Sequence, residues 1–389
     1  MKRTSLPHLR DLSRRGFLAG GAGTAVLALA GCSSEGGGGG RGLDDAEVAD
    51  LAEIDGDLNL LTFADYFAPE VLSGFEEHYD VKINYTYFSS ADEAIAKLSA
   101  GQPVDVTTMG SERVLQIAES GLLKRVDHDA IEHYGEVLPA FVVPPYNGSD
   151  EEANELTAPF VAAPYATGSV GLAWRTDHVQ GLTGSFEDLW SHPEAKGHVY
   201  LWDVMQFTIS IVLHRLGLDP SEAGDTEMRQ VLEATEEIRP IIGGFAGMDT
   251  TLIQNGQAWL MPAYAGDLFI AMHEMNEDQR ALWQFQTNKE SALFNADNFI
   301  IPAASEHSGT ALCFIDWLLQ PENMRVNAEY VGYPIPTTTG MEVYEGLAAE
   351  YPWLHIDEEI FSDTTQWLTP IPDDRLRLWQ QTWNTMKAG

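Results

Sequence analysis

The chain has 389 residues, of which 59 are Asp or Glu and only 22 are Lys or Arg, so its formal net charge is −37. Nucleic acid is excluded as a partner, because neutralising phosphates requires clustered basic side chains. Docking on an anionic membrane surface is excluded for the same reason. Hydrophobic residues still make up 44% of the chain, enough to build a core.

This acidity is typical of a halophilic protein. At about 1 M salt the Debye length falls to roughly 3 Å, so repulsion between surface carboxylates is largely screened. We therefore expect most of the acidic side chains to be solvated surface groups, and only a few of them to serve a cationic ligand.

The first residues predict an export signal. Arg14 and Arg15, followed by Gly-Phe-Leu, resemble a twin-arginine signal. The apolar stretch over residues 17–30 is shorter than the roughly 20 residues that a membrane-spanning helix needs. We expect residues 1–31 to be a cleaved signal peptide; the alternative is a disordered basic tail followed by a buried helix.

Leu-Ala-Gly-Cys, ending at Cys32, resembles a lipobox, in which that cysteine becomes the lipid-bearing first residue of the mature chain. A glycine run over residues 36–40 follows, and residues 32–54 are predicted to form a flexible Gly-rich tether. The sequence thus predicts an exported protein, anchored by Cys32 to the extracellular face of the membrane. The other cysteine, Cys313, is predicted to be a buried apolar residue.

The next segment alternates strand and helix patterns. Ser90 and Glu93 have the spacing of a capping box at a helix start. Such an alternation predicts a largely parallel sheet covered on both faces. The predicted strands are residues 58–63, 81–88 and 104–109, and the predicted helices are residues 69–79, 90–101 and 111–120.

A second group of elements follows a loop over residues 143–155. The chain from residue 55 to residue 389 is longer than one hydrophobic core usually serves, so a second core is expected. Predicted strands are 163–174, 199–202, 258–264 and 299–302, and predicted helices are 209–216, 228–238 and 309–319. We expect an α/β protein with two lobes, one formed by residues 55–160 plus 294–338 and the other by residues 161–293 plus 339–389.

Several short segments, in this order and spacing, resemble the extracellular solute-binding proteins of the spermidine/putrescine type, which serve ABC importers. The segments are Leu60–Tyr66, Phe75–Glu76, Val104–Val106, Glu119–Leu123, Val126–Asp127, Phe186–Trp190, Tyr264–Asp267, Phe294–Asp297 and Val331–Pro336. The resemblance implies a periplasmic-binding-protein-like fold of type II, with a ligand cleft between two α/β lobes. It also implies a monomer that captures a polyamine or related organic cation and delivers it to a permease.

Open α/β sheets bind ligands beyond the carboxyl ends of their strands. Those ends are predicted at residues 63–66, 109–112, 203–207 and 264–267. An ammonium has three donors and no acceptor, so its site needs carboxylates and aromatic faces, and these loops contain both. Ser111, Glu112 and Asp203 are candidates on this ground.

The resemblance adds specific roles. It implies cation anchors at Asp65, Asp267 and Asp297, and aromatic walls at Phe63, Tyr66, Tyr264 and Phe294. Where the family has a Glu after an inner strand of the second lobe, this chain has Phe207 with Gln206 beside it, so one amine pocket is expected to be rebuilt or lost. The alternative for each aspartate is a solvated surface group or a helix cap.

Other function classes have weaker support. No nucleophile elbow, phosphate-binding loop or complete metal motif is present, so neither an enzyme nor a cofactor is expected, and a secreted hydrolase is the remote alternative. Asp127, His128, Asp129 and His133 lack the ligand set of a zinc site. A ferric-ion or thiamine receptor of the same fold is the nearer alternative, with Tyr330 and Tyr333 as candidate iron ligands, although Tyr333 is expected to be structural.

Overall fold

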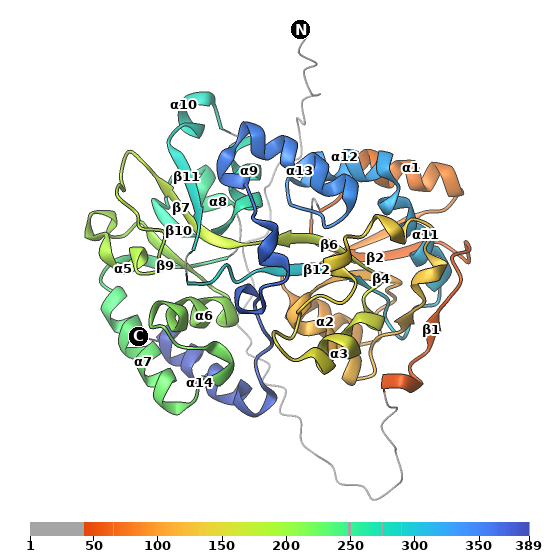
Figure 1. Cartoon of the computed structure of the whole chain (residues 1–389), viewed down its shortest axis with the longest axis horizontal. Coiled ribbons are helices and arrows are strands. Elements are labelled where there is room, and N and C mark those ends of the chain that lie inside the picture. The colour runs from red at the N-terminus through yellow and green to blue at the C-terminus, as the bar shows by residue number, and fades with distance from the viewer. Residues whose placement is uncertain (1–42, 65, 248–249, 274, 289, 389) are drawn as a thin grey trace, which may run out of the picture. The chain divides into compact units, whose positions relative to one another are not determined.

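A computed structural model describes residues 43–64, 66–247, 250–273, 275–288 and 290–388 (Figure 1). Its strands are β1 (Val48–Ala49), β2 (Leu58–Thr62), β3 (Ile83–Tyr87), β4 (Val106–Gly110), β5 (Arg125–Val126), β6 (Ala163–Gly168), β7 (Val170–Arg175), β8 (Val199–Trp202), β9 (Ile242–Ala246), β10 (Leu260–Tyr264), β11 (Trp283–Thr287) and β12 (Asn295–Ile300). Its α-helices are α1 (Pro69–Tyr79), α2 (Ala91–Ser99), α3 (Ser111–Glu119), α4 (Glu151–Thr157), α5 (Asp188–Ser191), α6 (Met205–Arg215), α7 (Asp225–Ile238), α8 (Thr251–Gln254), α9 (Ala265–His273), α10 (Glu277–Arg280), α11 (Ser308–Leu319), α12 (Pro321–Val331), α13 (Thr338–Glu350) and α14 (Asp373–Ala388).

The first sheet has five strands in the order β3-β2-β4-β12-β6. Strand β2 runs parallel to β3 and β4, whereas β12 is antiparallel to both β4 and β6. Apolar side chains such as Leu58, Leu60 and Val106 are fully buried on it. Helices α1, α11 and α12 pack together beside this sheet (Figure 1).

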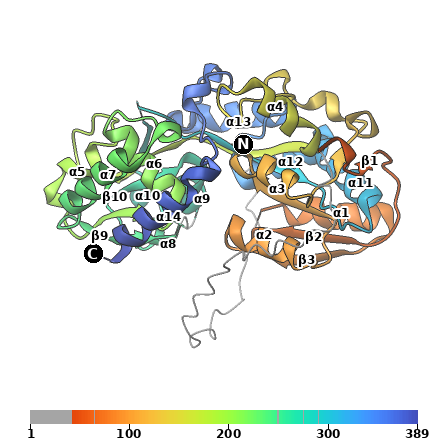
Figure 2. The same ribbon diagram turned by 90° about the horizontal axis from the view of Figure 1, so that it is seen from below.

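The second sheet also has five strands, in the order β11-β7-β10-β8-β9. Strands β8, β9 and β10 are parallel, and β7 is antiparallel to β10 and β11. Helices α6, α7 and α14 pack against one another beside these strands (Figure 2). The parallel strands of each sheet therefore end in loops that lie at one edge of that sheet.

The chain passes between the sheets at Ser169. The sequence predicts one strand over residues 163–174, but the structure forms two: β6 pairs with β12 in the first sheet, and β7 pairs with β10 in the second. Strand β6 therefore belongs with the first group of elements, although the second lobe was predicted to begin at residue 161. The chain returns between β11 and β12, where Leu293 has a positive φ of 41°.

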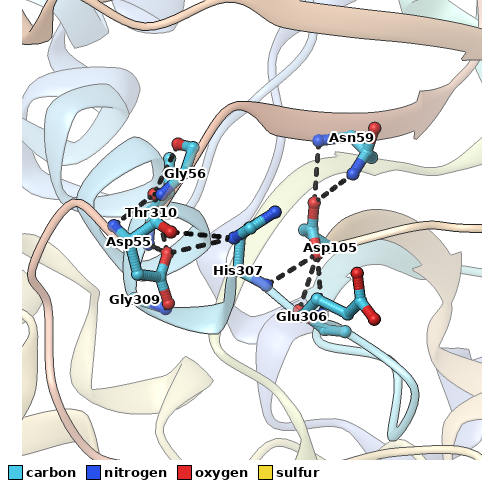
Figure 3. A network of polar contacts seen from close by, with 9 residues as sticks. Asp55, Gly56, Asn59, Asp105, Glu306, His307, Gly309 and Thr310 are labelled. Atoms are coloured by element: carbon cyan, nitrogen blue, oxygen red, sulfur yellow. Dashed lines mark hydrogen bonds and ion pairs between the residues drawn. The ribbon is translucent and has the colours of Figure 1, made fainter.

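A polar network joins strand β2 and the residue before β4 to the start of α11 (Figure 3). The Asp105 carboxylate, 1% exposed, accepts hydrogen bonds from the Asn59 amide nitrogen at 2.9 Å and side chain at 2.7 Å. Its other oxygen accepts from the Ser305 hydroxyl at 2.9 Å and from the backbone N–H groups of Glu306 and His307. Asp55 similarly accepts from the Thr310 backbone N–H at 3.0 Å. These bonds hold β2, the start of β4 and the start of α11 together.

Helix α13 packs against α12, whose partners lie in the first group, whereas α14 packs against α6 and α7 in the second. Residues 339–389 were predicted to belong together in the second lobe, so the structure places the first part of that range differently. Between them, residues 351–372 run past both groups in short 3₁₀ turns. None of the described helices is long and apolar enough to cross a membrane.

Candidate functional site

Strand register brings acidic and phenolic side chains together at the end of the first sheet. Asp297 on β12 lies opposite Gly110, the last residue of β4, and Glu112 follows in the first turn of α3. The Tyr66 hydroxyl, in the loop after β2, donates a short hydrogen bond to Asp297. Tyr66 is held in turn by its carbonyl, which accepts from the Tyr165 hydroxyl at 2.6 Å.

Glu112 folds back over the end of its own strand. A Cβ at Gly110 would lie 2.6 Å from one Glu112 carboxylate oxygen, so only glycine leaves room for this position. Burial raises the pKa of Glu112 to about 7. One of its carboxylate oxygens, Oε2, has no hydrogen-bond partner within the described residues. An acid in this state has an unmet requirement for a donor or a cation.

A second group of side chains comes from the end of β10 and the first turn of α9. The Tyr264 hydroxyl donates to the Asn295 side-chain oxygen at 3.1 Å, and the Tyr333 hydroxyl donates a short hydrogen bond to Asp267. A Cβ at Gly266 would lie 2.8 Å from the Tyr333 ring, so this close approach again requires glycine. Tyr333 follows α12, so its bond to Asp267 joins the link after α12 to helix α9, which follows strand β10 of the second sheet.

These groups are close enough to influence one another's charge. Burial, and next the charge of Asp297, raise the pKa of Tyr66 and of Tyr264, while burial and Asp267 raise that of Tyr333. Burial raises the pKa of Asp297 to about 6, although the bond from Tyr66 opposes the shift. We define the tyrosine–carboxylate cluster as Tyr66, Glu112, Tyr264, Asp267, Asn295, Asp297 and Tyr333.

Further aromatic rings border the cluster. Phe63 packs against Tyr66 at 5.4 Å and against Phe88 at 4.2 Å between ring centroids. Tyr264 lies 5.3 Å from Trp202 and 6.1 Å from Phe207. Phe207 is buried, so the place where the family resemblance implies a glutamate is filled by an apolar ring.

Three other predicted site residues lie outside the tyrosine–carboxylate cluster. Asp203 forms an ion pair with Lys387 at 2.5 Å. Phe294 was predicted to be a wall of the cleft, but it is fully buried, and its ring packs against Trp367 at 4.8 Å, because its side chain points from the crossing strand into the core. Ser111 is also buried, and its hydroxyl accepts from the Ala296 backbone N–H at 3.4 Å. Asp65 and Cys32 lie outside the described residues.

The sequence did not place two members of the cluster in the cation site. Tyr333 was expected to be structural, and Asn295 was not proposed. The signal for Tyr333 was its place in the Gly-Tyr-Pro-Ile-Pro link, whose prolines make it rigid enough to hold a phenol in position. Tyr330, proposed beside it as an iron ligand, is 38% exposed on α12.

One group of possible metal ligands lies elsewhere in the described part of the chain. Glu132, His133 and Asp316 offer ligand atoms within 4.8 Å of one another. His133 already uses its backbone N–H and its Nδ1 to contact Asp316, at 2.8 and 3.1 Å. His128, also considered as a ligand, contacts the Val161 carbonyl at 2.7 Å and stacks on Tyr134. These contacts give both histidines a structural role.

Comparison with known proteins identifies the class. Residues 70–351 match the family described as bacterial extracellular solute-binding protein, and the chain belongs to this family. It is similar to the putrescine/agmatine-binding protein of Pseudomonas aeruginosa, with 24% identity over 349 residues that cover 85% of this chain and 92% of the relative. It is also similar to the spermidine/putrescine-binding periplasmic protein of Escherichia coli K12, with 22% identity over 342 residues that cover 87% of this chain and 93% of the relative.

Solved structures show the same fold. A spermidine/putrescine ABC transporter substrate-binding protein from Streptococcus pneumoniae matches with a TM-score of 0.69 and 20% identity, covering 86% of this chain and 99% of that one. A protein described as a putative spermidine/putrescine ABC transporter, from Listeria monocytogenes, matches with a TM-score of 0.73 and 18% identity over the same shares. The predicted α/β fold of the periplasmic-binding-protein type is thus confirmed.

Proposed function

We propose that this protein captures a polyamine or a related organic cation at the tyrosine–carboxylate cluster and delivers it unchanged to the permease of an ABC importer. The names of its relatives and the acidity of the cluster support this proposal. Asp267 and Asp297 serve as cation anchors, together with Asp65 if that residue acts as the family resemblance implies. Glu112 is a further anchor in this proposal, while Phe63, Tyr66 and Tyr264 supply apolar and aromatic contacts.

The proposal depends mainly on one observation, that two carboxyl groups of the cluster are buried and have raised pKa values. Burial raises the pKa of both Glu112 and Asp297, and the phenols bonded to the cluster are held protonated as donors. Buried carboxylates are destabilising unless they are paired. An ammonium with three N–H groups supplies the missing donors and charge, each such bond contributing about 1.5–3 kcal/mol. Two or three such bonds together with apolar contact reach about 8 kcal/mol, the level of micromolar affinity.

Closure about the two crossing segments is the proposed mechanism. Asp297 lies on β12 of the first sheet and Asp267 in the first turn of α9, which follows β10 of the second sheet. The chain passes between the sheets at Ser169 and near Leu293. A dication that binds both carboxylates stabilises the arrangement in which the sheets approach each other, and the permease recognises that arrangement.

Export and anchoring complete the proposal. The twin-arginine motif at Arg14 and Arg15, the lipobox ending at Cys32 and the glycine run after it support a lipid-anchored receptor on the extracellular face. We expect Cys32→Ser to release the protein from the membrane fraction into the medium. Equal retention of the variant and the wild type would contradict the anchor.

Titration calorimetry in molar salt tests the ligand class, with putrescine, spermidine, thiamine, ferric citrate and glutamate as the panel. We expect heat of binding with at least one polyamine, and none with the anion. An absence of binding to every polyamine would overturn the proposed ligand class.

A ferric-ion receptor is the second candidate, because three phenols and three carboxylates gather in the cluster. The raised pKa of all three phenols disfavours it, since iron binds phenolate. Visible charge-transfer colour on addition of ferric citrate would favour iron over a polyamine.

A further inference from the structure

Asp203 was predicted to hold a ligand ammonium, and the structure shows an ammonium of the chain itself in that position. The Lys387 Nζ lies 2.5 Å from the Asp203 carboxylate. It also lies 5.0 Å from the centre of the Phe245 ring and 5.5 Å from that of Trp383. A carboxylate and two aromatic faces around one primary ammonium are the chemistry by which amines are recognised.

Three separate elements contribute the residues around this ammonium, which we call the Lys387 site. Asp203 follows β8, Phe245 lies on β9, and Trp383 and Lys387 lie on α14, whose end is close to β9 in Figure 2. The Asp203 backbone N–H donates to the Ala246 carbonyl at 2.6 Å, which fixes the carboxylate beside β9. A lysine in the last turn of a helix is favoured by the helix dipole alone. That effect does not explain why its ammonium also lies against the Phe245 ring and the Asp203 carboxylate, which come from other elements.

The Lys387 site and the tyrosine–carboxylate cluster are connected through residues 202 and 203 at the end of β8. Asp203 directly follows Trp202, whose ring lies 5.3 Å from that of Tyr264. The Asp203 side chain is 45% exposed, and that of Lys387 is 34% exposed, so an ammonium from solvent can reach the carboxylate if the lysine is absent. A surface ion pair of this kind contributes little to stability, so little is lost when the lysine is exchanged.

We propose that Lys387 fills a second ammonium site with its own side chain and thereby limits the length of the cation that the protein accepts. The inference about length rests on the proposed function. A cation with two amines binds at the cluster, whereas the additional amine of a longer cation finds the neighbouring carboxylate already paired. Removal of the lysine amine leaves Asp203, Phe245 and Trp383 free to take an external primary ammonium.

The first arm of the test is independent of polyamine binding. Lys387→Ala, labelled with 5-fluorotryptophan, is titrated with n-butylammonium chloride at constant ionic strength, and the Trp383 resonance is assigned from Trp383→Phe. We expect a saturable shift of that resonance in Lys387→Ala. Wild type and Lys387→Met, whose side chain still fills the space, should show at least a fivefold weaker response. Equal responses of the three proteins would overturn the site.

The second arm measures length. We expect Lys387→Ala to bind spermidine at least fivefold more tightly than wild type, and putrescine within twofold, with Lys387→Met unchanged for both. A butylammonium response without any gain for spermidine would overturn the limit on length while leaving the site. A wild type that binds no polyamine would refute the proposed function instead, and the butylammonium arm would still decide the site.

Discussion

Glu112 shows most directly how single residues set the chemistry of the cluster. Its pKa is raised to about 7 by burial, against an ordinary value of 4.5. A carboxyl group whose pKa is raised by folding stabilises the folded state below its unfolded pKa, and this contribution is lost as the pH rises through the folded pKa. The unliganded protein should therefore lose stability between about pH 4.5 and pH 7 on account of this residue.

We predict that Glu112→Gln removes that part of the pH dependence and raises the free energy of unfolding of the unliganded protein at pH 8 by about 1–3 kcal/mol. Urea unfolding in molar salt at pH 5 and pH 8 measures the effect. Glu119→Gln, on the exposed face of the same helix, is the control and should change neither value. A variant whose stability falls with pH as steeply as that of the wild type would contradict the assignment.

Ligand binding should have the opposite dependence on pH. A cation favours the charged carboxylates, so binding must release the protons that Glu112 and Asp297 hold when unliganded. We expect the affinity for putrescine to increase at least tenfold from pH 5 to pH 8. Calorimetry in two buffers of different ionisation enthalpy would reveal the proton release, and an affinity that is constant across this range would argue against buried anchors.

The predicted strand ends indicate where in the fold the cluster lies. Which residues belong to the cluster depends on the directions of their side chains. Tyr66, Tyr264 and Asp267 lie at or just beyond the end of a strand. Asp297 joins them because β12 runs antiparallel to β4 and places it opposite Gly110. Phe294 lies one residue before β12 and turns into the core instead, since the chain there is crossing between the sheets. Sequence periodicity cannot fix that direction where the strand itself begins at a crossing.

At the scale of elements, Asp105 couples a strand to a helix start. Its buried carboxylate accepts five hydrogen bonds, and an amide in its place would direct N–H groups at donors. We predict that Asp105→Asn lowers the free energy of unfolding by about 2–4 kcal/mol. Urea denaturation measures it, with Asp57→Asn as the control, because Asp57 is exposed and accepts one bond that asparagine can also accept. Equal stability of the two variants would show that the network contributes nothing.

Local capping signals in the sequence proved informative. Ser90 caps α2 by accepting from the Glu93 backbone N–H at 3.3 Å, as its spacing predicts. The Glu93 carboxylate reaches back to the Ser89 backbone N–H at 2.9 Å, one residue before the expected partner. Helix ends of this kind depend on neighbouring residues only, which is why sequence reasoning locates them to within a residue.

Elements that depend on distant partners were harder to predict. Strand β9 contains two adjacent glycines and was not predicted, since glycine is depleted in strands, but pairing with β8 holds it. The continuous apolar pattern over residues 163–174 predicts one strand, but the structure forms two. Both halves are buried, so the pattern does not change at Ser169, where the chain passes from one sheet to the other. Helix α13 lies with the first group of elements because it packs against α12. No pattern within its own sequence predicts that contact.

For the whole molecule, the charge of −37 predicts a strong dependence on salt. The 59 acids far outnumber the 22 Lys and Arg, so net repulsion among the acids opposes folding until salt screens it. We predict that the thermal midpoint rises by at least 10 °C between 0.1 M and 2 M KCl. Scanning calorimetry measures it, and an unchanged or falling midpoint would contradict the halophilic interpretation.

Asp297 on β12 and Asp267 on α9 are proposed to bind one organic cation together. Calorimetry with the polyamine that the wild type binds, in molar salt at pH 8, tests this in Asp297→Asn and Asp267→Asn, with the exposed Asp129→Asn as the control. We expect each cluster variant to bind at least tenfold more weakly than the wild type and the control to bind equally well. Wild-type affinity in both cluster variants would show that the two carboxylates do not hold the cation.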